Sequence, residues 1–200
     1  MTRIAFVRHG QTPWNATDRF QGSSDIALND FGRAQAGRAA SWFLDNLPDA
    51  QWDFVRHSPL SRAAETAAII ADTLSVDKRI PLPSLTERDW AAAEGLTFEQ
   101  CLELWPKMAE VDEFAARELI PGAEPKSLVV ERGRYCVSTL VDQFPEAQVI
   151  AATHGTLMRL TLTDFFGAQM GFVPNTGIVV MDAQRVDGDL SVNLVAKSWA

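Results

Sequence analysis

The 200-residue sequence contains few cysteines, few basic residues and no long apolar stretch. Its two cysteines, Cys101 and Cys136, lie far apart and outside any metal or redox spacing, which argues against a disulfide framework and favours a reducing compartment. The formal net charge of −8 disfavours nucleic acids and anionic membranes as partners. The apolar run at residues 4–7 is too short for a signal-peptide core, and no later stretch could span a bilayer. We therefore expect a cytoplasmic protein.

Histidine is scarce as well. The three histidines, His9, His57 and His154, are dispersed and form no ligand spacing such as His-Glu-x-x-His, so the sequence predicts no metal site. What is present is an ordinary globular composition, with 46% apolar and 22% charged residues. This length supports one substantial core and is too short for two full domains, so we expect residues 1–200 to form a single domain.

Short apolar runs alternate with amphipathic helical patterns along most of the chain. The runs at residues 4–7, 54–55 and 149–152 are typical of buried strands, and two further strands are expected near residues 178–181 and 190–196. Apolar residues recur at helical spacing in residues 30–47, 60–74 and 129–144, and another helix is expected directly after His154. Asn29 is the expected N-cap of the first helix, and Pro48 ends it. This order predicts an α/β fold, a three-layer α/β/α sandwich with a mainly parallel mixed sheet.

Residues 89–125 interrupt that alternation. Acidic side chains dominate this segment, with only Lys107 and Arg117 in its 89–120 part as basic residues, and aromatic residues are interspersed. We interpret it as a small helical cap insertion over the site, with a plain solvated helical excursion as the alternative.

Two predicted strands end in a histidine followed by glycine, as Arg8-His9-Gly10 and His154-Gly155. The carboxyl ends of parallel strands meet at one edge of a sheet, where ligands of open α/β sheets bind. Glycine lets the backbone approach a ligand closely, and the helix that begins near Gly155 points its amides toward an anion. Each pair alone is weak evidence.

Arg62 lies in the first turn of the helix that follows the second strand, so it can reach the same edge with a planar fork of donors. By itself it would be interpreted as a surface arginine. His57, just before this block, is interpreted as structural. A neutral imidazole is available near pH 7, and cationic neighbours should disfavour protonation of His9.

The ordered set of motifs resembles the histidine phosphatase superfamily, the phosphoglycerate-mutase-like enzymes. The resemblance runs through nearly the whole chain, on these blocks: Arg8-His9-Gly10-Gln11-Thr12, Trp14-Asn15, Arg19-Phe20-Gln21-Gly22, Asp25, Leu28, Gly32, Gln35-Ala36, Ser58-Pro59-Leu60, Arg62-Ala63, Thr66-Ala67, Leu85-Thr86-Glu87, Glu94-Gly95 and His154-Gly155. Its specificity lies in the order and spacing of these blocks.

The resemblance implies a role for each matched residue. His9 would become phosphorylated, with Arg8, Arg62 and His154 around the transferred group. Asn15 would add a hydrogen bond to that group, and Gln21, Gly22 and Gly155 would border it. Glu87 matches the proton donor, whereas Glu94 is interpreted as structural because one donor suffices. The family implies neither a metal nor another cofactor.

Four positions depart from the family pattern. Ala91 and Ala93 stand where relatives commonly carry glycine and a bulky side chain, so the wall near Glu87 is expected to be reshaped. Thr156 replaces a frequent glycine, and Pro125 takes the place of a serine at the entry to the next helix. Proline is tolerated in a first helical turn, so only the contacts of that serine are in doubt.

The expected function is metal-independent hydrolysis of a small phosphomonoester through a phosphohistidine. A mutase that returns the phosphoryl group to its substrate is the alternative, but residues 89–120 lack the adjacent arginine pair of the cofactor-dependent mutases, and an acidic cap is a poor clamp for a multiply charged phosphoacid. A non-catalytic phosphate-binding module is the third possibility. The expected partner is a small phosphorylated metabolite. The sequence leaves its identity and any homo-oligomer open.

Overall fold

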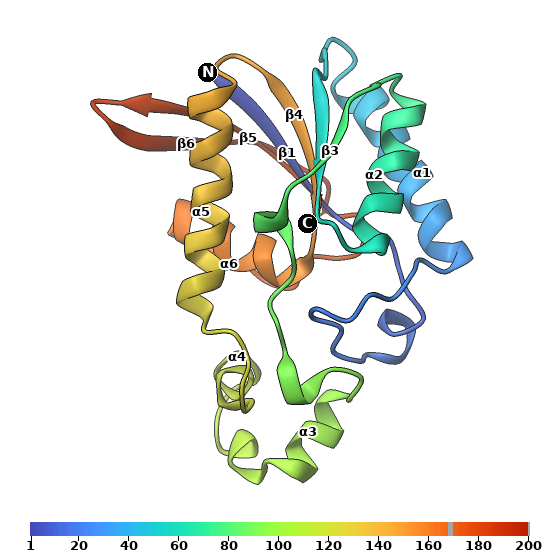
Figure 1. Cartoon of the computed structure of the whole chain (residues 1–200), viewed down its shortest axis with the longest axis vertical. Coiled ribbons are helices and arrows are strands. Elements are labelled where there is room, and N and C mark those ends of the chain that lie inside the picture. The colour runs from blue at the N-terminus through green and yellow to red at the C-terminus, as the bar shows by residue number, and fades with distance from the viewer. Residues whose placement is uncertain (168–169, 200) are drawn as a thin grey trace.

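A six-stranded sheet forms the centre of the computed structural model, which describes residues 1–167 and 170–199. The strand order is β3-β2-β4-β1-β5-β6. Four strands run parallel: β1 (Thr2–Arg8), β2 (Phe54–His57), β3 (Arg79–Pro81) and β4 (Gln148–Thr153). The hairpin of β5 (Ile178–Val186) and β6 (Asp189–Lys197) is antiparallel and extends beyond the helices that flank it (Figure 1). The predicted mainly parallel mixed sheet is confirmed.

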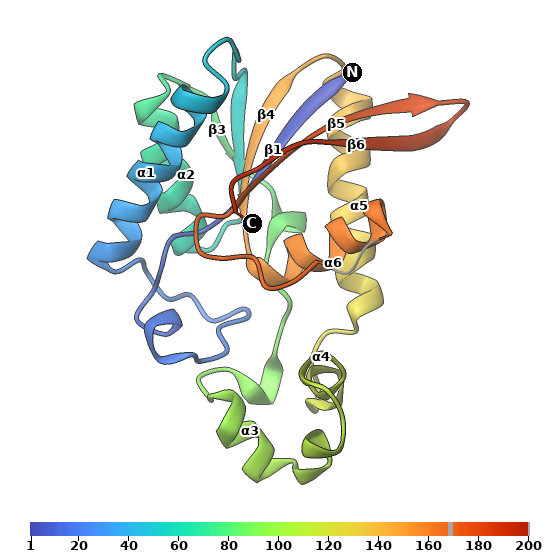
Figure 2. The ribbon, with the colours of Figure 1, turned by 180° about the vertical axis from the view of Figure 1, so that it is seen from behind.

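Helices cover both faces of the sheet, as the predicted three-layer sandwich requires. On one face lie α1 (Asp30–Asn46) and α2 (Ser61–Thr73), and on the other α5 (Lys126–Gln143) and α6 (Gly155–Phe166), as Figure 2 shows from behind. Alternate strand residues point to the two layers: Ile4 and Phe6 pack into the core that contains α5 and α6, whereas Ala5 and Val7 pack into the core with α1 and α2. This alternation is the two-residue period of a strand buried on both sides.

The local sequence explains where the elements begin and end. Asn29 Oδ1 accepts a hydrogen bond from Gly32 N at 2.7 Å, which confirms the predicted N-cap of α1. The helix ends at Asn46, two residues before Pro48. One strand was not predicted: β3 has only three residues, all exposed, and therefore carries no apolar run or alternation.

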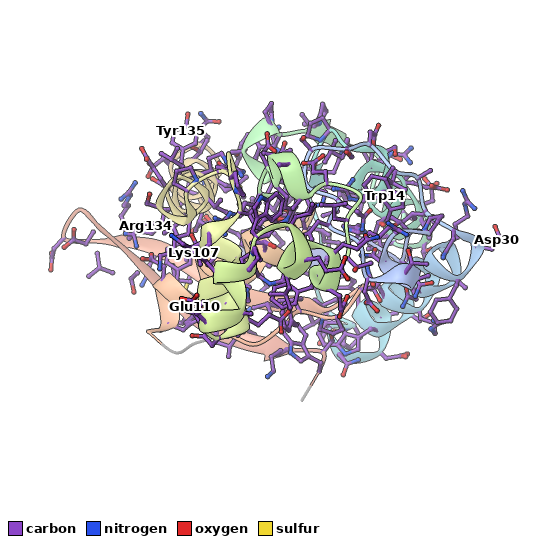
Figure 3. The ribbon with its side chains drawn as sticks, turned by 90° about the horizontal axis from the view of Figure 1, so that it is seen from below. Trp14, Asp30, Lys107, Glu110, Arg134 and Tyr135 are labelled. Carbon is purple, nitrogen blue, oxygen red and sulfur yellow. The ribbon has the colours of Figure 1, made fainter. Side chains whose placement is uncertain are left out.

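Residues 89–125 fold into short helices below the carboxyl ends of the strands (Figure 1). These are η3 (Ala91–Ala93), α3 (Phe98–Leu104), η4 (Pro106–Glu110), α4 (Glu113–Ala116) and η5 (Arg117–Leu119), preceded by η2 (Pro83–Leu85). They enclose a small core of their own, in which Trp90, Cys101 and Met108 pack with Phe20 from the loop after β1. Seen from this end, the segment lies in front of the sheet and carries Lys107 and Glu110 (Figure 3).

Of the helices formed by residues 1–167 and 170–199, none has the length and apolar character that crossing a membrane requires. Cys101 and Cys136 are both buried free thiols in different cores, which agrees with their interpretation as ordinary apolar residues.

Candidate active site

His9 lies directly after β1, and the residue is only 3% exposed. Its Nδ1 is 2.7 Å from the carbonyl oxygen of Gly10. A carbonyl oxygen can only accept, so Nδ1 carries the proton and Nε2 of the neutral ring keeps its lone pair. Burial, together with the charges of Arg62 and Arg8, holds the pKa of His9 well below its ordinary value. The ring is therefore neutral at neutral pH and can act as a nucleophile.

Gly10 is fixed by a close approach of two backbone segments. A Cβ built on Gly10 would lie 2.3 Å from the carbonyl oxygen of Gly32 in the first turn of α1. The Gly10 N–H donates to Thr66 Oγ1 of α2 at 3.0 Å. The loop after β1 is thus clamped between two helices, and this holds the His9 ring in place.

His154 follows β4, the strand next to β1 in the sheet. Its ring meets that of His9 edge-on, with centroids 5.1 Å apart. The side chain is fully buried, and neither ring nitrogen finds a hydrogen-bond partner in the part of the chain that the structure describes. Burial and the nearby charges of Arg62 and Arg8 lower the pKa of His154. A buried ring with two unused nitrogens can bind a ligand oxygen beside His9.

Arg62 and Arg8 are each held on one side by backbone carbonyls. Arg62 is fully buried; its Nη1 donates to Ser24 O at 2.7 Å and its Nη2 to Gly22 O at 2.8 Å. The Arg8 Nη1 donates to Val173 O at 2.6 Å. The Nε of each has no partner among residues 1–167 and 170–199. Burial lowers the pKa of Arg8 to about 10, so the group is still charged at neutral pH. Both cations can stabilise an anion between them.

The loop that supplies the carbonyls for Arg62 is organised by Glu94. Its carboxylate accepts hydrogen bonds from the N–H groups of Ser23 at 2.7 Å and Ser24 at 2.9 Å, and from both serine hydroxyls. These bonds lower the pKa of Glu94 against the opposing effect of burial. Gly22 has a positive φ of 53°, and a Cβ there would lie 2.0 Å from Glu94 Oε1. Glu94 thus makes structural contacts, as interpreted from the sequence.

Gln21 and Asn15, the two amide side chains expected from the sequence, line the cavity next to His9. Gln21 Oε1 accepts from Thr12 Oγ1 at 2.8 Å, and Asn15 Oδ1 accepts from Thr12 N at 3.2 Å and Asn175 Nδ2 at 3.3 Å. Because both carbonyl ends are occupied, the amide N–H groups are the ends that can donate to a ligand.

Glu87 lies at the N-terminus of α6. Its Oε2 accepts from Thr156 N at 3.1 Å, and its Oε1 accepts from Leu157 N at 3.1 Å and Arg88 N at 2.8 Å. The carboxylate is thereby fixed against the first turn of the helix and faces the cavity. Thr156, one of the departures from the family pattern, supports Glu87 through its backbone.

The other three departures from the family pattern, Ala91, Ala93 and Pro125, lie outside the contact between Thr156 and Glu87. Ala93 is buried in the small core of residues 89–125, while Ala91 is exposed with a φ of 46°. Pro125 occupies the N-cap position of α5, and its carbonyl accepts from Leu128 N. His57 donates from Nδ1 to Ser58 O at 2.8 Å and does not line the cavity, in agreement with a structural role.

A cavity of about 530 Å³ brings these groups together. All predicted site residues line it except His154, which packs against the ring of His9. Sequence reasoning missed several lining residues, among them Arg159, Phe172 and Asn175. Arg159 lies one helical turn after Gly155, and this spacing was the available signal. Within the described ranges, no cluster of three or more His, Cys, Asp or Glu side chains is placed to hold a metal ion.

Comparisons with known proteins agree with this geometry. Residues 4–191 match the family model described as "Histidine phosphatase superfamily (branch 1)". Over 167 residues the chain is 29% identical to the "Uncharacterized phosphatase PhoE" of Bacillus subtilis, covering 84% of this chain and 79% of that protein. It is 28% identical over 190 residues to a 2,3-bisphosphoglycerate-dependent phosphoglycerate mutase of Neisseria meningitidis, covering 78% of this chain and 81% of that enzyme.

Among solved structures, a mycobacterial glucosyl-3-phosphoglycerate phosphatase superposes with a TM-score of 0.81 at 25% identity, covering 97% of each chain. The predicted family, enzyme class and fold are confirmed by these matches. Over nearly its whole length, the chain belongs to the histidine phosphatase superfamily, branch 1.

Proposed function

We propose that this chain hydrolyses a small phosphomonoester in two steps, through a phosphohistidine at His9. One observation carries the proposal: the buried His9 ring donates from Nδ1 to a carbonyl, which leaves the Nε2 lone pair beside two arginines that are fixed by backbone oxygens. A nucleophile with its orientation and protonation set in advance needs little reorganisation before it attacks phosphorus.

In the first step, the Nε2 lone pair of His9 attacks phosphorus and the bond to the ester oxygen breaks. Arg8, Arg62 and the single ring N–H of neutral His154 surround the transferred group, where charge on its oxygens needs donors. The amide groups of Asn15 and Gln21, with the backbone at Gly22 and at the Gly155 end of α6, complete this shell. Glu87 in its protonated form gives a proton to the departing oxygen, so the alcohol leaves neutral.

In the second step, water attacks phosphorus and the P–N bond breaks. Glu87, now a carboxylate, takes the proton from the water, and the lone pair returns to His9 Nε2. Inorganic phosphate is released and the enzyme returns to its starting state. One carboxylate therefore serves both steps.

Transfer of the phosphoryl group back to substrate is the alternative, and it uses the same residues. Hydrolysis is favoured because the segment 89–125 lacks the adjacent arginine pair of the cofactor-dependent mutases. A pocket that only binds phosphate is disfavoured because His9 and Glu87, the residues proposed as nucleophile and proton donor, both line the cavity. We propose further that residues 1–200 act as one domain with 89–125 as its cap, in the cytoplasm, on a small phosphorylated metabolite.

A phosphate-release screen over a panel of metabolites tests the proposal, with His9→Ala as the control. We expect release from at least one small phosphomonoester and none above background from the variant. Rapid interconversion of 2- and 3-phosphoglycerate with little inorganic phosphate would instead identify a mutase. Unchanged function in His9→Gln would identify a binding module.

A further inference from the structure

Arg132 on α5 makes five hydrogen bonds next to Glu87, and the proposed chemistry uses none of them. Its Nη1 donates to the carbonyl oxygens of Ser84 at 3.0 Å and Thr86 at 2.8 Å, and its Nη2 donates to that of Glu87 at 3.4 Å. The other two bonds run from Nε and Nη2 to the two carboxylate oxygens of Glu124, at 2.9 Å each. One side chain thus binds three carbonyls of the segment that carries the proposed proton donor.

Glu87 lies in a segment without regular secondary structure. Residues 86–90 are neither helix nor strand and connect η2 to η3. In Figure 1 the green turn of η2 lies beside α5, which brings Arg132 to this segment. Carbonyls outside helices and sheets need other donors, and a guanidinium presents five N–H groups in one rigid plane. Arg132 therefore fixes the course of residues 84–87, where no helix or strand ladder does so.

Glu124 holds Arg132 in place and also secures the residues that follow Glu87. The side chains of this ion pair are only 27% and 18% exposed, and both carboxylate oxygens take part. The Glu124 N–H donates to the carbonyl oxygen of Asp89 at 2.9 Å, and the Glu124 carbonyl accepts from Arg88 Nε at 2.7 Å. The chain is therefore fixed on both sides of Glu87.

The carboxylate of Glu87 itself is held by the amides of Thr156 and Leu157. Both amides lie in the first turn of α6, where an N–H group has no partner within the helix. A carboxylate that gains a proton turns one acceptor oxygen into a donor, so these contacts change during proton transfer. Arg132 binds backbone carbonyls, and its bonds do not depend on the protonation of the Glu87 side chain. It can hold Glu87 in both forms.

We propose that Arg132 is a positioning residue, which keeps Glu87 aligned for proton transfer by binding the carbonyls of this segment. The inference rests on the proposed function, since it concerns the proton donor of the same site. Arg132 lies outside the cavity that contains His9, so it acts through Glu87 and has no contact with the ester. A displacement of about 1 Å can lower the rate about hundredfold. Loss of Arg132 should therefore slow the steps that need a proton from Glu87.

Two esters with similar rings and different leaving groups test the proposal. 4-Nitrophenyl phosphate releases nitrophenolate, a stable anion that leaves without a proton, whereas benzyl phosphate releases an alkoxide that needs one. The cavity is lined by Phe20, Trp90 and other aromatic side chains, which suit both rings. The value of kcat/KM covers only the steps up to release of the alcohol, so the attack of water does not enter the comparison.

The variant Arg132→Met keeps the stem of the side chain and removes all of its donors, while Arg132→Lys keeps the charge. We expect Arg132→Met to lower kcat/KM about ten- to hundredfold for benzyl phosphate and less than about threefold for 4-nitrophenyl phosphate. Arg132→Lys should show a smaller difference, because an ammonium group can donate to part of these carbonyls.

Arg134→Met is the matched control. Arg134 lies on the same helix as Arg132, but its side chain is exposed and pairs with Asp164 (Figure 3). The control should keep the wild-type kcat/KM for both esters. Arg132→Met should fold as well, because a second hollow of about 390 Å³ borders Arg132 and Glu124, and water from it can bind the carbonyls that lose the guanidinium.

Hydrogen exchange of the Thr156 and Leu157 amides, followed by NMR without a substrate, gives a readout that does not depend on turnover. Glu87 is the partner of both amides, so their exchange reports whether its carboxylate stays in place. We expect both amides to exchange faster in Arg132→Met than in the wild type. The amide of Leu162, in the middle of α6, should exchange at the wild-type rate.

The inference is overturned if Arg132→Met lowers kcat/KM for both esters by the same factor, as a purely structural role would, or changes neither value. If the wild type turns over neither aromatic ester, hydrogen exchange decides: faster exchange of the Thr156 and Leu157 amides supports the inference, and equal rates overturn it. If the metabolite panel also releases no phosphate, the proposed function fails by itself, whatever the exchange rates show.

Discussion

Replacement of Glu94 by glutamine should affect both stability and turnover, although Glu94 does not line the cavity. The carboxylate accepts from Ser23 N, Ser24 N and the two serine hydroxyls, with Trp90 N at 3.3 Å. Glutamine has only one acceptor oxygen. If that oxygen takes the place of Oε1, the new amide nitrogen faces the Ser24 N–H, which is then left without an acceptor. The Ser24 hydroxyl can instead rotate and accept from the amide. One unsatisfied backbone donor costs about 1–3 kcal/mol.

The functional effect passes through Arg62. The Ser24 carbonyl, on the same residue as the lost hydrogen bond, fixes the Arg62 Nη1 at 2.7 Å. We expect Glu94→Gln to lower the free energy of unfolding by about 1–3 kcal/mol and to lower kcat by about tenfold, because a mispositioned cation stabilises the transition state less.

Urea unfolding and steady-state phosphate release measure these two effects. Glu110→Gln is the matched control, since Glu110 is exposed in η4 at the front of the segment in Figure 3. If Glu94→Gln unfolds like the wild type and turns over at the same rate, the carboxylate does not hold the loop that positions Arg62.

Three further predictions concern packing, pH and metals. Gly10→Ala should lower the free energy of unfolding by about 3 kcal/mol because its Cβ would meet the backbone of Gly32, whereas Gly37→Ala in α1, where nothing lies within 4 Å, should raise it by about 0.5–1 kcal/mol. His9 and His154 have lowered pKa values, so the unfolded chain binds more protons below about pH 6.5. The free energy of unfolding should then fall on acidification, by up to about 1.4 kcal/mol per pH unit for each histidine. Phosphate release should be unchanged by a chelator such as EDTA.

Each of these predictions has a contrary result. Equal urea midpoints for Gly10→Ala and the wild type would show that the two backbone segments can move apart. The slope of the free energy of unfolding against pH can be measured between pH 7 and 5.5 in phosphate-free buffer. If this slope is the same in the wild type and in His154→Gln, His154 does not titrate as its burial requires. Loss of turnover in EDTA, with recovery on addition of a divalent cation, would contradict a metal-independent mechanism.

The sequence predicted those parts of the fold that depend on local or periodic signals. Asn29 caps α1 as expected because an N-cap bond forms within three residues, and the strands at residues 4–7 and 149–152 were identified from apolar runs. The strand β3 was missed because its pairing with β2 depends on a partner distant in the chain, while its own three residues are exposed. The same limit applies to the carbonyl of Val173, which fixes Arg8 from far along the chain.

The candidate site shows the same division. Motif order was enough to expect His9, Arg62 and His154 at one sheet edge, and the parallel pairing of β1, β4 and β2 brings them there. The proton position on His9 could not be predicted, because it depends on which ring nitrogen meets the Gly10 carbonyl. Arg159 was not singled out, although it lies one helical turn after Gly155, because the helical period alone does not show that this face of α6 lines the cavity.

A rapid-quench experiment with a phosphomonoester labelled with ³²P tests the central claim most directly. When the reaction is stopped with base within the first turnover, each protein molecule should carry one label that is labile in acid and stable in base. Digestion under basic conditions should then place this label on the peptide that contains His9. The His9→Ala variant should carry none. An enzyme that releases phosphate while no label forms at any quench time, or that carries its label on another residue, would contradict the account.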